Sequence, residues 1–200
     1  MTLNTTLIIQ ALVNGILIGS IYALVAIGLA LIFGVMNIVN FAHGSLMMMA
    51  MYLSYWLFVL LKIDPYLSMV ATIPFLFFSG LLIQRFLIDY VLEAKHSIQI
   101  LLTVGLSLSL DNFALFLFSP DFRGISVSYQ TYSFVLGDII INYPQIIAFF
   151  LASTLTFFLY IILKKTTVGK AIRATSVEKE GAILVGINTR QIYYLTFGLG

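Results

Sequence analysis

The chain has 200 residues, of which 61% are hydrophobic and only 9% are charged, and its mean hydropathy is +1.07. These values exclude an ordinary soluble globular domain and indicate a membrane protein. The chain has no cysteine, which excludes disulfides and thiolate metal sites.

Five apolar runs are long enough to cross a bilayer, since about 20 apolar residues in a helix span a hydrocarbon core about 30 Å thick. They are residues 7–33, 41–61, 66–83, 98–118 and 144–163. A sixth run starts at "IYYLTFGLG" and stops at Gly200. We therefore expect an all-α polytopic membrane protein with five full spans and the start of a sixth. Residues 1–200 would form a single transmembrane domain that is incomplete at its C-terminus.

The first span carries small residues along one helical face. Gly15 and Gly19 form a small-xxx-small pair within it, a pattern that lets helices pack closely in membranes. The pattern does not say which helix is the partner. Packing within the chain and packing against another subunit both remain open.

Between the first two spans, the stretch "GVMNIVNFAHGSLMMM" places polar residues among apolar runs. Asn37 and Asn40 are suited to satisfy the backbone groups left free between two helices, with Asn40 as the N-cap of the second helix. His43 then falls in the first turn, and Gly44 permits a close approach. The cluster predicts a helix break, and both a capped junction and a place in a translocation path remain open.

The fourth span has a polar stripe in which side chains recur every four residues. They are Gln99, Thr103, Ser107 and Asp111. An aspartate near the centre of a membrane helix costs about 2.5 to 3.5 kcal/mol, so Asp111 should face the bundle interior, a wet cavity or a donor. Hydrogen bonds between helices and a lining role in a pathway both remain open for Asp111.

The stretch that follows, "SPDFRGISVSYQTYSFVLGDIIINYPQ", is rich in Ser, Tyr and β-branched residues. Gly137 and Asp138 stand as a turn between two short strand-like runs. We therefore predict a small external hairpin between the fourth and fifth spans.

The basic residues set the orientation. Of the ten Lys and Arg residues, six lie in residues 164–190, so the positive-inside rule places this segment in the cytoplasm. Counting spans back places Arg85 and Lys95 inside, Lys62 and Arg123 outside, and the N-terminus outside. Because the basic residues flank membrane spans, the net charge of +2 reflects topology and does not suggest nucleic-acid binding.

The cytoplasmic segment carries the signals of a short helix. Thr175 and Glu178 can form a capping box at its start, and Gly186 is placed to end it. Asn188 or Thr189 can then cap the next span. The short helix would expose the apolar run "AILV", which needs cover from lipid headgroups or from a cytoplasmic partner.

The stretch "EGAILVGIN" resembles the EAA-type cytoplasmic loop of ABC importer permeases, and with "GKAIRAT" it looks like the branched-chain amino-acid permease family. The resemblance covers almost the whole chain, because "NGILIGSIYALVAIGLALIFGVMNIVNFAHGSLMM", "ILLTVGLSLSLDN" and "VGKAIRATSVEKEGAILVGIN" are similar to family blocks in the same order. It is greatest to the smaller, H-type permease. Gly181 departs from the pattern, since a second small residue, often Ala, usually stands there, and the glycine loosens the short helix by up to about 1 kcal/mol.

The resemblance implies an inner-membrane permease subunit of an ATP-driven importer, with the fold of an ABC importer permease helix bundle. It also implies an external solute-binding protein, a second permease subunit and two cytoplasmic ATPases that hold ATP and Mg²⁺. The sequence has no GxxxxGK[ST] phosphate loop, so no cofactor is expected in this chain. We expect ATPase coupling in the cytoplasmic segment, at Arg173, Glu178, Glu180, Gly181, Ala182, Gly186 and Ile187.

An ion-coupled secondary transporter is the main alternative, because such proteins also use broken helices and membrane-embedded carboxylates. An intramembrane enzyme built on His43 lacks a second ligand or nucleophile nearby, so neither a catalytic nor a metal site is expected. A structural scaffold has no positive feature behind it. Branched-chain or other small apolar amino acids, urea and short amides remain open as substrates. The candidates for the path or the helix break are Asn37, Asn40, His43, Gly44, Thr103, Ser107 and Asp111.

Overall fold

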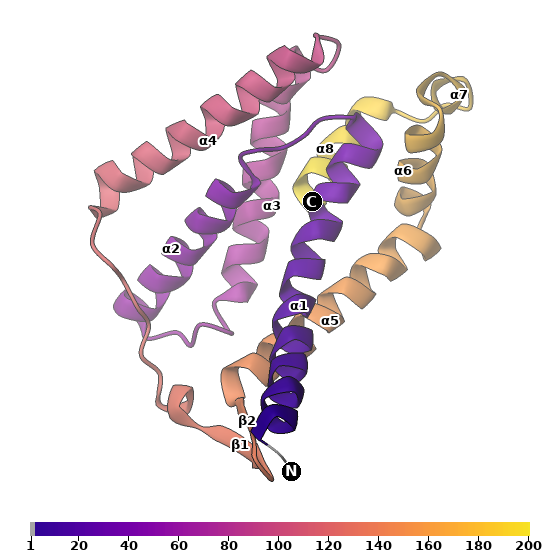
Figure 1. Cartoon of the computed structure of the whole chain (residues 1–200). Helices are drawn as coiled ribbons and strands as arrows, with labels where there is room; N and C mark the ends of the chain where they lie inside the picture. Colours follow the sequence, from indigo (N-terminus) through magenta and orange to yellow (C-terminus); the bar gives the residue numbers. More distant parts are fainter. Residues whose placement is uncertain (1–2) are drawn as a thin grey trace. The chain divides into compact units, whose positions relative to one another are not determined.

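The structure is a computed structural model that describes residues 3–200 (Figure 1). Its long helices confirm the predicted all-α polytopic architecture. The helices are α1 (Leu3–Met36), α2 (His43–Leu61), α3 (Met69–Phe86), α4 (His96–Phe118), α5 (Tyr143–Lys165), α6 (Thr167–Val177), α7 (Lys179–Leu184) and α8 (Thr189–Leu199). Two 3₁₀ turns, η1 (Ile88–Tyr90) and η2 (Ser128–Thr131), and two strands, β1 (Ser133–Leu136) and β2 (Ile139–Asn142), complete the described elements.

Five of these helices are long and apolar enough to cross a membrane: Thr5–Met36, His43–Leu61, Met69–Tyr90, His96–Phe118 and Tyr143–Lys165. They match the five predicted spans. The third begins three residues later than predicted, because Asp64 closes a turn ahead of it. Its carboxylate accepts from the Tyr66 N–H at 2.9 Å and its carbonyl from the Ser68 N–H at 2.9 Å.

The chain divides into two compact units. Unit 1 comprises Met1–Ile27 and Ser126–Thr166, and unit 2 comprises Gly28–Ile125 and Thr167–Gly200. The first boundary falls inside α1. The prediction of one permease domain stays a prediction.

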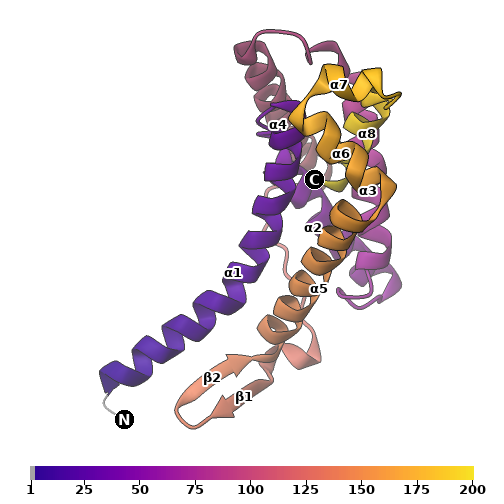
Figure 2. The same cartoon turned by 90° about the vertical axis from the view of Figure 1, so that its right-hand side faces the viewer.

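Unit 1 holds the predicted hairpin. β1 and β2 pair antiparallel around Gly137, whose φ of 64° is the left-handed conformation that a tight turn requires. Figure 2 shows the hairpin just before α5. The side-chain amide of Gln10, on α1, donates to the Ile140 carbonyl at 2.7 Å and accepts from its N–H at 2.9 Å. Gln10 thus occupies the free edge of β2 as another strand would.

In unit 2, α8 packs antiparallel against α3 (Figure 1). The helices approach closely, since a Cβ on Gly80 would lie 3.0 Å from the Cα of Gly198. The apolar core of this unit gathers around them and consists of Ile32, Met36, Ile38, Ile88, Tyr193 and Phe197. The residues expected to begin a sixth span therefore form a helix buried against the third.

Helices α2 and α4 also pack together in unit 2, and they run parallel. Ser45, near the start of α2, contacts Ser107, midway along α4, and the ring of Tyr52, midway along α2, stacks at 4.4 Å on Phe118, the last residue of α4. Helices separated by one intervening span must run in the same direction across a membrane. The pairing therefore agrees with α2, α3 and α4 as three successive spans.

Candidate functional site

The predicted helix break is present at residues 37–42. Asn37 adopts the left-handed conformation, with φ of 59°, and its N–H donates to the Phe33 carbonyl at 2.8 Å. Asn tolerates this conformation better than most residues and commonly ends helices in it. Asn40 is buried, and its side-chain oxygen accepts from the Ala42 N–H at 3.1 Å. The Asn40 side chain thus satisfies a backbone group at the junction, as the sequence predicted, whereas Asn37 contributes its left-handed backbone.

The predicted N-cap role of Asn40 is wrong. α2 begins at His43, and the N-cap position is Ala42, which provides no side-chain cap. The amide oxygen of Asn40 instead closes a turn two residues further on, and its carbonyl accepts from the His43 N–H at 3.3 Å. This extra turn delays the helix, so His43 is the first residue of α2 and not the third of its first turn.

Helix α4 holds the break in place. The Thr103 hydroxyl is completely buried and donates to the Val39 carbonyl, inside the break, at 3.1 Å. One turn further along α4, the hydroxyls of Ser45 and Ser107 lie 2.8 Å apart. Thr103 and Ser107 therefore fix the break on α4, and Ser45 is a third member that the sequence interpretation missed.

The other predicted path residues are not joined to this network. Neither the His43 ring nor the Asp111 carboxylate hydrogen-bonds to the described residues of unit 2, and both residues are partly exposed. Gly44 is exposed, with no atom within 4 Å of where a Cβ would stand. The side chain of Asn112, beside Asp111, donates to the carbonyl of Leu108 in its own helix at 2.7 Å. The interhelical hydrogen bonds considered for Asp111 are absent from this unit.

The segment predicted to be cytoplasmic contains two helices, α6 and α7, where the sequence predicted one. The predicted capping box is wrong, because Thr175 lies inside α6, buried, with its hydroxyl unpartnered in the described chain. Glu178 takes the N-cap position of α7, without a side-chain capping bond. The helical pattern "VGKAIRATSV" continues through Thr175, so the chain turns only after Val177.

Gly186 ends α7 as predicted. Its φ is 84°, its N–H donates to the Ile183 carbonyl at 2.9 Å, and the Ile187 N–H donates to the Ala182 carbonyl at 3.0 Å. This pair of bonds is the Schellman arrangement, which needs a left-handed residue at the position of Gly186. Asn188 then caps α8 by accepting from the Gln191 N–H at 3.2 Å.

Helix α7 presents an apolar surface. Ile183, Leu184 and Val185 are 51%, 87% and 75% exposed, and the acidic Glu178 and Glu180 beside them are also exposed. Ala182 was predicted to be exposed with them, and this is wrong, because it is only 3% exposed. The remaining predicted coupling residues fall into two groups: Arg173 and Gly186 are exposed, and Gly181 and Ile187 are half-buried.

A buried carboxylate ties this segment to α3. Asp89, in η1, accepts from Gln84 Nε2 at 3.0 Å, from Arg190 Nε at 2.9 Å and from the Tyr194 hydroxyl at 2.7 Å. The Asp89 side chain is 8% exposed. Gln84 lies in the last turn of α3, whereas Arg190 and Tyr194 lie in the first turns of α8. One side chain thus joins the turn after α3 to the helix that follows α7.

A second, weaker link lies near α7. Lys179 Nζ is 3.4 Å from a carboxylate oxygen of Glu93, and their side chains are 46% and 88% exposed. Such an exposed ion pair contributes little to stability. Its position still places the start of α7 beside the chain that follows η1.

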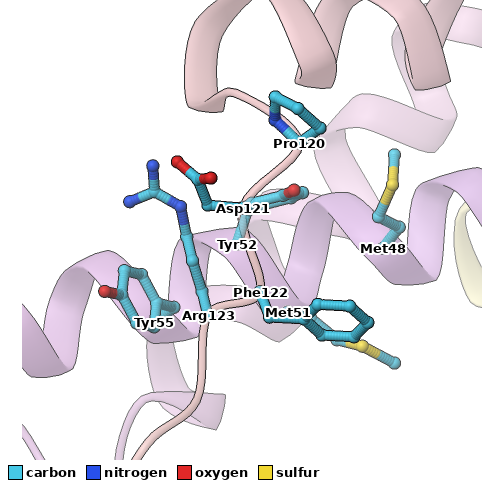
Figure 3. Close-up of a pocket in the computed structure, with 8 residues that line it drawn as sticks. All are labelled: Met48, Met51, Tyr52, Tyr55, Pro120, Asp121, Phe122 and Arg123. Atoms are coloured by element: carbon cyan, nitrogen blue, oxygen red, sulfur yellow. The ribbon is translucent and has the colours of Figure 1, made fainter.

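A pocket of about 330 Å³ opens in unit 2 between α2 and the segment that follows α4 (Figure 3). It is lined by Met48, Met51, Tyr52, Tyr55, Pro120, Asp121, Phe122 and Arg123. The Arg123 guanidinium lies over the rings of Tyr55 and Trp56, at 5.6 Å and 5.3 Å from their centroids. It also donates to the Phe118 carbonyl. The pocket therefore combines a fixed cation with a mostly apolar wall.

The small-residue face of α1 has no packing partner in unit 1. No atom lies within 4 Å of where a Cβ would stand on Gly15 or Gly19. Further along α1, a cavity of about 400 Å³ lies between Ala23 and the α5 residue Phe157. The sequence left open whether Gly15 and Gly19 pack within the chain or against another subunit. Within unit 1, no helix packs against these two glycines.

Among residues 3–200, no three His, Asp or Glu side chains are grouped so that they could hold a metal ion. The histidines lie at the starts of different helices, His43 on α2 and His96 on α4. The candidate functional features of unit 2 are the helix break at residues 37–42, the exposed apolar turn of α7 and the pocket beside Arg123.

A family model described as "Branched-chain amino acid transport system / permease component" matches residues 11–200. The chain belongs to this family. Its five apolar helices and its family together identify a multi-pass protein of the inner membrane, and the family consists of transport permease components and not of enzymes.

Individual relatives are also permease proteins of branched-chain amino acid transport systems. The chain is 29% identical to the high-affinity branched-chain amino acid transport system permease protein BraD of Pseudomonas aeruginosa and to the corresponding LivH of Escherichia coli K12, and 28% identical to LivH of Salmonella typhimurium. Each alignment covers 96% of this chain and 66% of the relative. The chain thus spans slightly less than two thirds of the length of these relatives. No solved structure matches it significantly.

Two groups of residues escaped the sequence interpretation. The sequence analysis assigns no role to Asp89, although an acid between Ile88 and Tyr90 in so apolar a chain indicates that a basic partner lies nearby. Asp121 and Arg123 were read only as external loop residues. They flank an aromatic residue, Phe122, directly after the fourth span, and the second span contains Tyr55 and Trp56. A base close to several aromatic residues is the pattern that would have predicted the pocket.

Proposed function

We propose that this chain is a permease subunit of an ATP-driven importer that forms part of the translocation path for branched-chain or other small apolar amino acids. Its partners would be a second permease subunit, two cytoplasmic ATP-binding subunits and an external solute-binding protein. The family supports this assignment, and the relatives' descriptions name branched-chain amino acids. ATP and Mg²⁺ would be held by the ATP-binding subunits.

The observation that carries the proposal is the exposed apolar turn of α7. Leu184 and Val185 are 87% and 75% exposed at a point that the Schellman bonds around Gly186 hold in one conformation. A rigid turn with apolar tips and acidic flanks suits insertion into a groove of a partner protein. An ion-coupled transporter has no need of such a surface between its fifth and sixth spans.

The contacts of α7 suggest how force from the ATPases would reach the membrane. Gly186 leads directly into α8, which Asp89 binds to the end of α3 through Arg190 and Tyr194. The close contact of Gly80 with Gly198 continues this pairing further along both helices. A displacement of α7 would therefore move α3 and α8 together, and the break at residues 37–42 offers a place for the chain to bend.

Reconstitution tests the proposal. Proteoliposomes that contain the full-length chain, its second permease and the ATPases should take up leucine only under two conditions. ATP must be present on the membrane face that carries the ATPases, and the binding protein must be present on the opposite face. Uptake driven by an ion gradient without the ATPases would establish the secondary-transport alternative instead. Neighbouring genes supply the candidate partners.

Variants of α7 test the docking surface. Glu180→Ala, Gly186→Leu and Leu184→Ser should all reduce ATPase co-purification and substrate-stimulated ATP hydrolysis. Glu180→Ala and Leu184→Ser should do so without disturbing the fold, whereas Gly186→Leu strains the left-handed turn itself while leaving the membrane helices intact. Leu136→Ser is the matched control, because Leu136 is a similarly exposed apolar residue, 61% exposed, on the hairpin of unit 1. Normal coupling in all three α7 variants would remove the docking assignment.

The absence of cysteine gives a direct test of orientation. We propose that the N-terminus and the hairpin face outward and that residues 164–190 face the cytoplasm. A membrane-impermeant maleimide should label Asp138→Cys in intact cells and Lys179→Cys only after permeabilisation. The reverse labelling would invert the topology.

A further inference from the structure

We propose that the pocket beside Arg123 is a binding site for a zwitterionic amino acid with an apolar side chain. It would receive the substrate on the outer side of this subunit before the substrate crosses the membrane. This inference rests on the proposed importer function and on its topology, in which α2 and α4 end outside. It adds a site, and residues for the two charged groups of the substrate, to that function.

The pocket is lined by one acidic and one basic side chain, the two charges that a zwitterion requires. Asp121 and Arg123 both line the pocket, and in the view of Figure 3 their charged ends extend to the same side of the chain. They form no ion pair with each other, and the Asp121 carboxylate is exposed with no recorded partner in unit 2. A substrate ammonium could therefore bind Asp121 while its carboxylate binds Arg123.

The guanidinium of Arg123 is fixed but incompletely satisfied. One nitrogen donates to the Phe118 carbonyl, and the group lies over Tyr55 and Trp56. Its Nε is buried without an acceptor in the described chain, and so is the indole nitrogen of Trp56. Buried donors are nearly always paired in proteins. Of these two donors, Arg123 lines the pocket, and its unpaired N–H calls for an acceptor from outside the chain, such as a carboxylate oxygen.

The remaining wall suits an aliphatic side chain. Met48 and Met51 project from successive turns of α2 into the pocket, and methionine adapts to differently branched ligands because its side chain is flexible. Phe122 projects in Figure 3 toward Met51, away from the charged ends of its neighbours. The pocket volume of about 330 Å³ lies at the lower end of the range of about 300 to 1,000 Å³ for small-molecule sites. A ligand of amino-acid size fits this description better than a peptide.

Binding to the assembled full-length transporter in nanodiscs, without the solute-binding protein, tests the site. The probe is radiolabelled leucine, competed by leucinamide, which lacks the carboxylate, and by 4-methylpentanoate, which lacks the ammonium group. Arg123→Gln should weaken leucine binding about tenfold or more and leave leucinamide competition unchanged. Asp121→Asn should do the converse: it weakens leucine and spares 4-methylpentanoate.

Arg123→Lys and Lys62→Gln serve as controls. The lysine keeps the charge but loses the planar fork, so it should restore part of the leucine affinity. Lys62 is the other cation assigned to the outer side, lies outside the pocket lining, and should be neutral for leucine binding. If Arg123→Gln lowers the yield of folded protein, the test rests on Asp121→Asn, because Asp121 is exposed and its replacement should not affect folding.

The outcomes separate this site from the importer function. Equal leucine affinity in wild type, Asp121→Asn and Arg123→Gln, or no leucine binding by an active wild-type complex, overturns the pocket proposal and leaves the importer standing. Failure of the wild-type complex to couple uptake to ATP overturns the importer function itself. Matched losses of all three ligands in both variants would also refute the site, because they would show no recognition of individual charges.

Discussion

Replacement of Asp89 by alanine should destabilise the protein more than any other single change in the turns around α7 and η1. Asp89 accepts three side-chain hydrogen bonds, from Gln84, Arg190 and Tyr194, while only 8% of its own side chain is exposed. The first partner belongs to α3 and the other two belong to α8. Alanine removes every acceptor at once and frees the first turns of α8 from α3.

The cost follows mainly from Gln84, which is completely buried. Its side-chain oxygen already lacks a partner in the described chain, so loss of Asp89 would leave the whole amide unsatisfied. A buried donor without an acceptor costs about 1 to 3 kcal/mol. Water can replace the partner of Arg190, whose side chain is 69% exposed, so this bond adds little. We expect the free energy of unfolding to fall by about 2 kcal/mol.

Thermal unfolding of the purified protein in detergent measures the effect. For a chain of this size, about 2 kcal/mol lowers Tm by about 4 to 8 °C. Asp89→Asn keeps one oxygen acceptor for Gln84 and should lose less than half as much. Glu93→Ala removes only the exposed partner of Lys179 and should melt with the wild type. If Asp89→Ala also melts with the wild type, the carboxylate does not hold α8 to α3.

Three further changes probe the rest of unit 2. Gly80→Ala should lower stability by about 1 to 3 kcal/mol, because the added Cβ would stand 3.0 Å from the Cα of Gly198. Thr103→Val should cost about 1 kcal/mol by removing the hydrogen bond to the Val39 carbonyl, measured by the same unfolding assay. His43→Leu should express normally but slow leucine uptake, since the ring makes no recorded hydrogen bond in unit 2 and lies directly after the helix break.

Matched controls accompany these variants. Gly105→Ala adds a Cβ to α4 where no atom lies within 4 Å, so it should not lower Tm. Ser109→Ala removes a hydroxyl that bonds only to the Gly105 carbonyl of its own helix, and it isolates the interhelical bond as the source of the Thr103 effect. Reduced expression of His43→Leu with normal uptake per molecule would assign His43 a packing role instead.

The spans and turns were predictable because their signals are local. A run of about 20 apolar residues has few stable alternatives to a membrane helix, and the turn at Gly137 and the helix end at Gly186 need residues that accept a positive φ. The capping role of Asn188 was also predictable from a local signal, because its side chain accepts from a backbone N–H only three residues away. These predictions needed no knowledge of neighbouring helices.

Predictions failed where two local signals competed. Asn40 is a good N-cap residue, yet its oxygen closes a turn with Ala42, and Thr175 precedes a glutamate at capping-box spacing, yet α6 continues through it. In both cases the same side chain or backbone can satisfy more than one hydrogen-bonding pattern. The choice between the patterns depends on contacts with residues distant in the sequence, such as that of Thr103 with the break.

The sequence by itself determined the class of protein, its five spans, the break before the second span and the capped turn before α8. Each of these depends on hydrophobicity or backbone conformation within a short stretch of chain. Only the tertiary structure decided that Asp89 joins α3 to α8, that Thr103 binds the break, and that Asp121 and Arg123 border an apolar pocket. These features join residues up to about a hundred positions apart, and their pairing arises only when helix packing brings the partners within hydrogen-bond distance.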